Sequence, residues 1–70
     1  MQELVECHAG YKYAERPLAL QWQGERLPVV EILNQWRDPD GAGFRVLTGD
    51  GQLFELFFRE FSDKWLINQL

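Results

Sequence analysis

The chain has 70 residues and a formal net charge of −4, with 7 Lys and Arg against 11 Asp and Glu. That balance argues against general binding to a phosphate backbone, which needs a clustered basic face, although it allows a local basic patch. No apolar run approaches the ~20 residues of a membrane span. Glu3 and Glu6 interrupt the apolar residues near the N-terminus, so this segment does not resemble a signal peptide. Because Cys7 is the only cysteine and cannot form an internal disulfide, we expect a cytoplasmic protein.

The length predicts a single β-domain over residues 1–70. Residues 1–16 read as a poorly alternating first strand followed by an irregular approach segment, and residues 17–70 as a β-meander core. Three Trp, two Tyr and five Phe supply the large apolar side chains that so short a chain needs. A core of this size typically yields only ~3–5 kcal/mol of net stability, which favours docking onto a partner or forming a homodimer.

Alternating apolar residues predict a first hairpin after Pro17. A two-residue turn at Gly24-Glu25 would pair Trp22 with Leu27. The same register would pair Leu20 with Val29. One face would then carry Leu18, Leu20, Trp22, Leu27 and Val29.

The stretch from Val29 to Arg37 fits two patterns. Its apolar residues suit both helical spacing and strand alternation. We favour a strand with a bulge near Glu31, because no capping residue precedes Val29. A single helical turn over residues 31–35 is the alternative.

Residues 43–58 predict a second hairpin, whose loop is placed by parity. A two-residue loop at Asp50-Gly51 would pair Val46 with Glu55. A three-residue loop over residues 49–51 pairs Val46 with Phe54 instead, with Gly51 at positive φ in a G1 bulge. Only this loop places the apolar residues on one face: Phe44, Val46, Phe54 and Leu56.

Turns predicted at residues 38–41 and 61–63 separate the remaining strands, and the last strand covers residues 64–68 with Trp65 and Ile67 on one side. Five or six short strands in this order predict an all-β fold, either a small curled antiparallel sheet or an SH3-like barrel.

No motif predicts catalysis, and we expect neither an enzyme nor a cofactor. Cys7 and His8 are adjacent, so they would point to opposite faces of a strand, and no further Cys or His completes a metal site. The acidic residues are scattered or lie in turns. The glycine-rich loops at residues 41–43 and 49–51 open no helix, so they make no phosphate cradle.

The aromatic residues are the remaining functional candidates. We expect Trp22 and Trp36 to pack mainly in the core, whereas Tyr11, Tyr13 and Phe57 suit the core and the surface equally. Aromatic side chains left exposed beside arginines can stack bases or anchor a partner. The candidate contact residues are Tyr11, Tyr13, Arg16, Trp36 and Arg37.

The order of landmarks over residues 13–67 resembles a family of small, uncharacterised bacterial domains. It also resembles the carboxyl-terminal segment of polymerase-like proteins of the Y-family in damage-induced mutagenesis. The landmarks are Tyr13-Ala14-Glu15-Arg16-Pro17, Trp22-x-Gly24, Val29, Ile32-Leu33-x-x-Trp36-Arg37, Phe44-x-Val46-x-Thr48, Asp50-Gly51-x-x-Phe54-Glu55-Leu56 and Asp63-x-Trp65-x-Ile67. The resemblance implies a non-catalytic accessory module near repair or translesion machinery.

Two functions follow as hypotheses. The first is a protein-interaction module, whose partner the resemblance places among repair or replication proteins. The second is a weak single-stranded nucleic-acid binder that uses the aromatic residues with Arg16, Arg37, Arg45 and Arg59. The negative charge favours the first. So does a departure from the resembling domains, which carry arginines where this chain has Gln21, Gln23 and Glu25.

Overall fold

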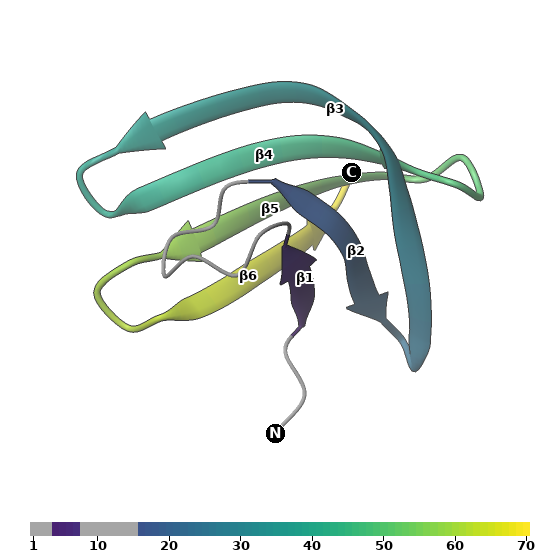
Figure 1. Cartoon of the computed structure of the whole chain (residues 1–70), viewed down its shortest axis with the longest axis horizontal. Helices are drawn as coiled ribbons and strands as arrows, with labels where there is room; N and C mark the ends of the chain where they lie inside the picture. Colours follow the sequence, from purple (N-terminus) through teal and green to yellow (C-terminus); the bar gives the residue numbers. More distant parts are fainter. Residues whose placement is uncertain (1–3, 8–15) are drawn as a thin grey trace.

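The computed structural model describes residues 4–7 and 16–70, and over them it is all-β, as predicted. Six strands form one antiparallel sheet in the order of the sequence, and the sheet curls into a half-barrel (Figure 1). The strands are β1 (Val5–Cys7), β2 (Pro17–Trp22), β3 (Glu25–Asp38), β4 (Gly41–Thr48), β5 (Leu53–Arg59) and β6 (Lys64–Gln69).

The long strand β3 gives the sheet its curl. Its first residues pair with β2, and from Val29 onward it pairs with β4 (Figure 1). The predicted bulge is confirmed, because the register shifts between Val29 and Glu31, and the helical turn is wrong. A second shift, between Ile32 and Asn34, was not predicted. Each bulge adds local twist, so the strand can serve both halves of the sheet.

The β4–β5 hairpin has the predicted three-residue loop. Val46 pairs with Phe54, and Phe44 pairs with Leu56. The amide of Gly51 donates to the carbonyl of Thr48 at 3.0 Å, and Gly51 has a φ of +85°. Glycine adopts this backbone region without the steric cost that a Cβ brings.

The predicted β2–β3 turn is wrong by one position. The loop is Gln23-Gly24, and Trp22 pairs with Glu25 rather than with Leu27. Both loop residues have positive φ, at 50° and 82°, which is typical of a type I′ turn. Leu20 therefore pairs with Leu27, and the shift of two positions still leaves Leu20, Trp22, Leu27 and Val29 on the predicted inward face.

Leu18 does not point inward as predicted, because it is 45% exposed. The cause lies in its pairing with β1. Glu6 pairs with Ala19 and Cys7 pairs with Pro17, so Leu18 is an extra residue that has no paired residue in β1. A residue in a bulge leaves the alternation of its strand.

The core fills the concave face of the half-barrel. Its buried members are Val5, Leu20, Leu27, Ala42, Phe44, Val46, Phe54 and Leu56. Trp22 packs edge-on against Phe54, with ring centroids 5.2 Å apart, and so joins β2 to β5 across the interior. Trp65 of β6 packs against Phe58 with ring centroids 5.1 Å apart. The predicted burial of Phe54 is confirmed, and so is the prediction that Trp65 and Ile67 lie on one side of the last strand.

The two remaining turns fall where the sequence predicts them. In the β3–β4 turn, the Asp38 carboxylate accepts hydrogen bonds from the amides of Asp40 and Gly41, at 2.9 and 3.2 Å. The β5–β6 turn follows Arg59, and Asp63 takes a positive φ of 57° at its end. The amide of Glu60 donates to the carbonyl of Asp40 at 3.0 Å, which ties the two turns together.

Candidate interaction surface

An apolar row crosses the outer face of the sheet, opposite the core. Trp36 pairs with Gly43, Gly43 pairs with Phe57, and Phe57 pairs with Leu66. Phe44 and Leu56 are fully buried on the inner face, so their neighbours Gly43 and Phe57 must face outward. We call Trp36, Gly43, Phe57 and Leu66 the aromatic row.

Gly43 lets the indole of Trp36 lie against the sheet. A Cβ built on Gly43 would fall 2.1 Å from Cε2 of Trp36 and 2.3 Å from its Cζ2. The ring therefore occupies the space where any other residue would carry a side chain. Trp36 is half-buried in this position on the outer face. The expectation that it packs mainly in the core is therefore wrong. The row consequently presents a broad ring that lies against the backbone of Gly43.

An ion pair lies beside the aromatic row on the same face. Arg45 pairs with Glu55 in the sheet, and their side chains meet at 2.5 Å. Both side chains are partly exposed, and pairs of this kind contribute at most about 1 kcal/mol. Beyond the ion pair, Leu47 pairs with Leu53, which is partly exposed. The outer face is therefore striped, with apolar rows on both sides of a neutralised charge pair.

Two cations stand on the other side of the aromatic row. Arg59 pairs directly with Lys64, so both side chains leave the same face of the sheet. Among the described residues, neither forms an ion pair. Asp38 lies in the same row, but its Oδ1 accepts the two turn amides described above. Like charges directly opposite each other destabilise a sheet, so this cation pair stands out as uncompensated.

The row ends at β6, which is an edge of the sheet. Within residues 4–7 and 16–70, β6 pairs only with β5. The amide of Leu70 donates to the carbonyl of Leu53 at 2.9 Å, so this residue and, by alternation, Asn68 and Leu66 turn their backbone groups toward β5. The backbone groups of the residues between them therefore face the open side: Trp65, Ile67 and Gln69.

The structure does not gather the predicted contact residues into one site. Tyr11 and Tyr13 lie outside the described residues. Arg16 is exposed at the entry to β2, whereas Trp36 lies on the outer face. Arg37 pairs with Glu60 at 2.7 Å near the turns. Of the five, only Trp36 belongs to the aromatic row.

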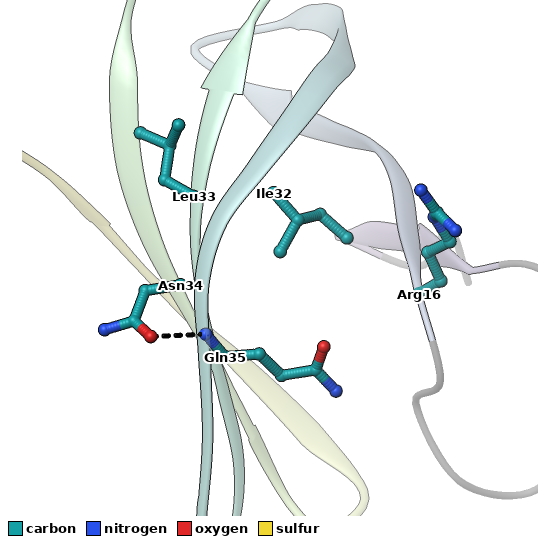
Figure 2. A pocket seen from close by; sticks show the side chains of 5 residues that line it. All are labelled: Arg16, Ile32, Leu33, Asn34 and Gln35. Atoms are coloured by element: carbon teal, nitrogen blue, oxygen red, sulfur yellow. Dashed lines mark hydrogen bonds between the residues drawn. The ribbon is translucent and has the colours of Figure 1, made fainter.

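Arg16 borders an open hollow of about 450 Å³ next to the bulges of β3. Figure 2 shows Ile32 and Gln35 pointing toward Arg16, while Leu33 and Asn34 point to the other side of the strand. The hollow offers one exposed cation and neutral polar groups. This arrangement carries no recognisable chemistry.

Two further polar clusters stabilise structure rather than form a site. Arg26 donates to both carboxylate oxygens of Glu6, at 2.7 and 3.1 Å, and this bonding lowers the pKa of Glu6. In the β4–β5 loop, hydrogen bonds from the Thr48 hydroxyl and then from the Gln52 amide lower the pKa of Asp50. Each carboxylate thereby holds a loop or a strand in place.

Sequence reasoning missed Gly43, Leu66 and Lys64. Alternation alone places Phe57 on the outer face, and the pairing of β5 with β6 would then have added Leu66. No sequence signal joins Trp36 to Gly43, because that contact depends on two bulges in β3.

No group of three or more His, Cys, Asp or Glu side chains that could hold a metal ion occurs in the described part of the chain. Nor does that part contain a helix long and apolar enough to cross a membrane. Comparisons with protein-family models, with curated proteins and with solved structures find no match to this chain.

Proposed function

We propose that this protein is a non-catalytic interaction module that holds a segment of a partner protein against the outer face of its sheet. The observation that carries the proposal is the aromatic row. Trp36 is fixed over Gly43, and the row continues through Phe57 to Leu66, which is 45% exposed. Rigid aromatic side chains at a surface are the usual anchors of protein interfaces.

The arrangement of the arginines supports a protein partner over a nucleic acid. Arg37 and Arg45 each meet a carboxylate, of Glu60 and Glu55 respectively. Stacking on an aromatic side chain contributes roughly 1–3 kcal/mol per base, but strand binding also needs a positive groove that follows the backbone. The net charge of −4 opposes such a groove. The resemblance described above directs the search for the partner to cytoplasmic repair and replication proteins.

A matched pair of variants tests this proposal. Leu66→Ser removes an apolar end of the row, and Leu18→Ser removes a side chain of equal exposure on β2, 45% in each case. Cross-linking through photoreactive groups at Leu66 would identify the bound protein by mass spectrometry, and titration calorimetry would measure its affinity. We expect Leu66→Ser to weaken binding at least tenfold and Leu18→Ser to leave it unchanged. Equal losses in both variants would remove the aromatic row from the interface.

A nucleic-acid titration tests the other hypothesis. Fluorescence anisotropy with a labelled single-stranded oligonucleotide, at about 150 mM salt, should show affinity no better than micromolar. Nanomolar binding that is lost in Trp36→Ala or Arg37→Ala would replace the interaction module with a nucleic-acid binder.

A further inference from the structure

The open edge of β6 and the cation pair beside it specify how a partner binds and which chemistry it carries. We propose, building on the function above, that an extended acidic segment of the partner adds to β6 as a further strand. In this segment an Asp or Glu faces Lys64, and an apolar residue two positions away faces Leu66.

The free edge of β6 is available to a further strand. Trp65, Ile67 and Gln69 turn their amides and carbonyls away from β5, as the Leu70 hydrogen bond shows. The register between β5 and β6 runs without a bulge, and β6 contains no proline. Proteins commonly block free edges with such features. Here the edge keeps the regular backbone that an added strand requires.

The charge at the edge of β6 favours an acidic partner. A single edge lysine would be explained as a device that discourages pairing. Lys64, however, lies directly opposite Arg59, and a like-charge pair costs stability when nothing compensates it. A carboxylate opposite Lys64 on an added strand would lie beside the cation pair and offset its positive charge. The chain itself places no carboxylate within ion-pair distance there, among the described residues.

The spacing of Lys64 and Leu66 along β6 sets the spacing of the partner residues. Lys64 and Leu66 lie two residues apart on one strand, so their side chains leave the same face. A partner residue opposite Leu66 would extend the aromatic row, and contact with Leu66 favours an apolar side chain. The partner residue between the two positions would face the inner side, next to the half-buried Trp65, which also favours an apolar side chain. The motif is therefore an acidic residue and two neighbouring apolar ones in extended conformation. The apolar residues follow the acidic one in a parallel strand and precede it in an antiparallel strand.

A second copy of the chain meets this requirement poorly. β6 reads Lys-Trp-Leu-Ile-Asn-Gln and contains no acidic residue. Antiparallel pairing of two β6 strands that keeps the faces matched would set Lys64 against Asn68 or Leu70, depending on register. The cation pair would stay uncompensated in both registers. The chemistry of the edge therefore favours a different, acidic chain.

The experiment uses capped synthetic peptides of about eight residues, enough for one strand. All are rich in Thr and Val, and the central segment is Val-Val-Asp-Val-Val, Val-Val-Asn-Val-Val or Val-Val-Lys-Val-Val, which fits β6 in either strand direction. NMR titration of the isotope-labelled protein measures affinity and reports amide shifts and hydrogen-exchange protection. We expect the Asp peptide to bind about threefold to fivefold more tightly than the Asn peptide, as one cross-strand charge pair predicts. Protection should rise at Trp65, Ile67 and Gln69.

Charge reversal supplies the control. Lys64→Glu should make the Lys peptide the better ligand, whereas Arg16→Glu changes the net charge equally at a distant exposed position and should preserve the preference for Asp. If Arg16→Glu reverses the preference as well, only the overall charge matters, and the motif is wrong. Shifts at Trp36 and Phe57 without protection on β6 would overturn strand addition.

Two outcomes separate this inference from the proposed function. If no peptide binds while a cross-linked partner still depends on Leu66, strand addition is wrong and the interaction module stands. If the peptides protect β6 but Leu66→Ser and Leu18→Ser bind a partner equally, the edge site stands without the aromatic row. A dimer that buries β6, found by analytical ultracentrifugation and exchange protection without peptide, would replace the acidic partner with a second copy.

Discussion

The two faces of strands β4–β6 share one backbone and differ completely in exposure. On the inner face, Phe44, Phe54 and Leu56 are fully buried. On the outer face, Phe57 is half-buried and Leu66 is 45% exposed, although they are the same residue types, Phe and Leu, that are buried on the inner face. An antiparallel sheet needs only one buried face to fold. The apolar side chains of the second face are therefore available for another purpose, and mutations on the two faces should separate folding from binding.

The largest expected effect contrasts Phe54 with Phe57. Phe54→Ala should lower the free energy of unfolding by about 3–5 kcal/mol, the range for a core phenylalanine, and can unfold so small a domain. Phe57→Ala should cost about 1 kcal/mol or less, because its side chain already meets solvent. Urea unfolding followed by circular dichroism measures both values. A cost for Phe57→Ala close to that for Phe54→Ala would mean that the outer face also supports the fold.

Gly43 determines how the outer face itself is packed. Gly43→Ala places a Cβ where the Trp36 ring lies and should expel the ring, at a cost of about 1–3 kcal/mol. Gly49→Ala is the matched control, because the nearest atom to its added Cβ is 3.7 Å away. Tryptophan emission should shift to the red in Gly43→Ala alone. The same spectrum and stability in both variants would show that Trp36 does not rest on Gly43.

The loop between β4 and β5, which sets which residues share a face, gives a smaller effect. Gly51 has a φ of +85°, so Gly51→Val should cost about 1–2 kcal/mol in backbone strain. Gly49→Val should cost less, because Gly49 lacks a positive φ. Urea midpoints at a constant slope compare the two variants. Equal midpoints would indicate a different turn.

The smallest effect is the pH dependence that Asp50 contributes. Hydrogen bonds from Thr48 and Gln52 lower its pKa below the ordinary value of 3.8. A carboxylate with a lowered pKa in the folded state stabilises the fold above its unfolded pKa, and this stabilisation is lost as pH falls through the folded value. The stability difference between the wild type and Asp50→Asn should therefore shrink as the pH falls below about 4. A difference that does not change between pH 7 and pH 2 would contradict this assignment.

The sequence predicted the inner face better than the outer one, for a physical reason. Parity and one glycine fix the β4–β5 register, since only a three-residue loop keeps Phe44 with Leu56 on a single face. The β2–β3 loop could not be placed in this way, because positive φ at Gln23 has no strong sequence signal. A shift of two positions also leaves the same residues inward, so hydrophobic pattern does not distinguish the two registers.

The candidate site depends on contacts between strands, which are harder to predict than faces. Trp36 meets Gly43 only because of the two bulges in β3. The expected grouping of Arg16 with Arg37 ignored Glu60, which is distant in sequence but joins Arg37 across the turns. The ion pair with Glu60 therefore engages Arg37, one of the expected contact residues.

The sequential order of the sheet has a consequence for how the chain folds. Within the described residues, each strand hydrogen-bonds only to its neighbours in sequence, and from β2 onward the connections have two to four residues, so these pairings close only short loops. Proteins dominated by such local contacts fold faster than β-proteins with distant pairings. The β4–β5 hairpin combines a short connection with four large buried side chains, Phe44, Val46, Phe54 and Leu56, so we expect it to be the folding nucleus. Stopped-flow measurements should find that Val46→Ala slows folding, whereas Leu27→Ala mainly accelerates unfolding.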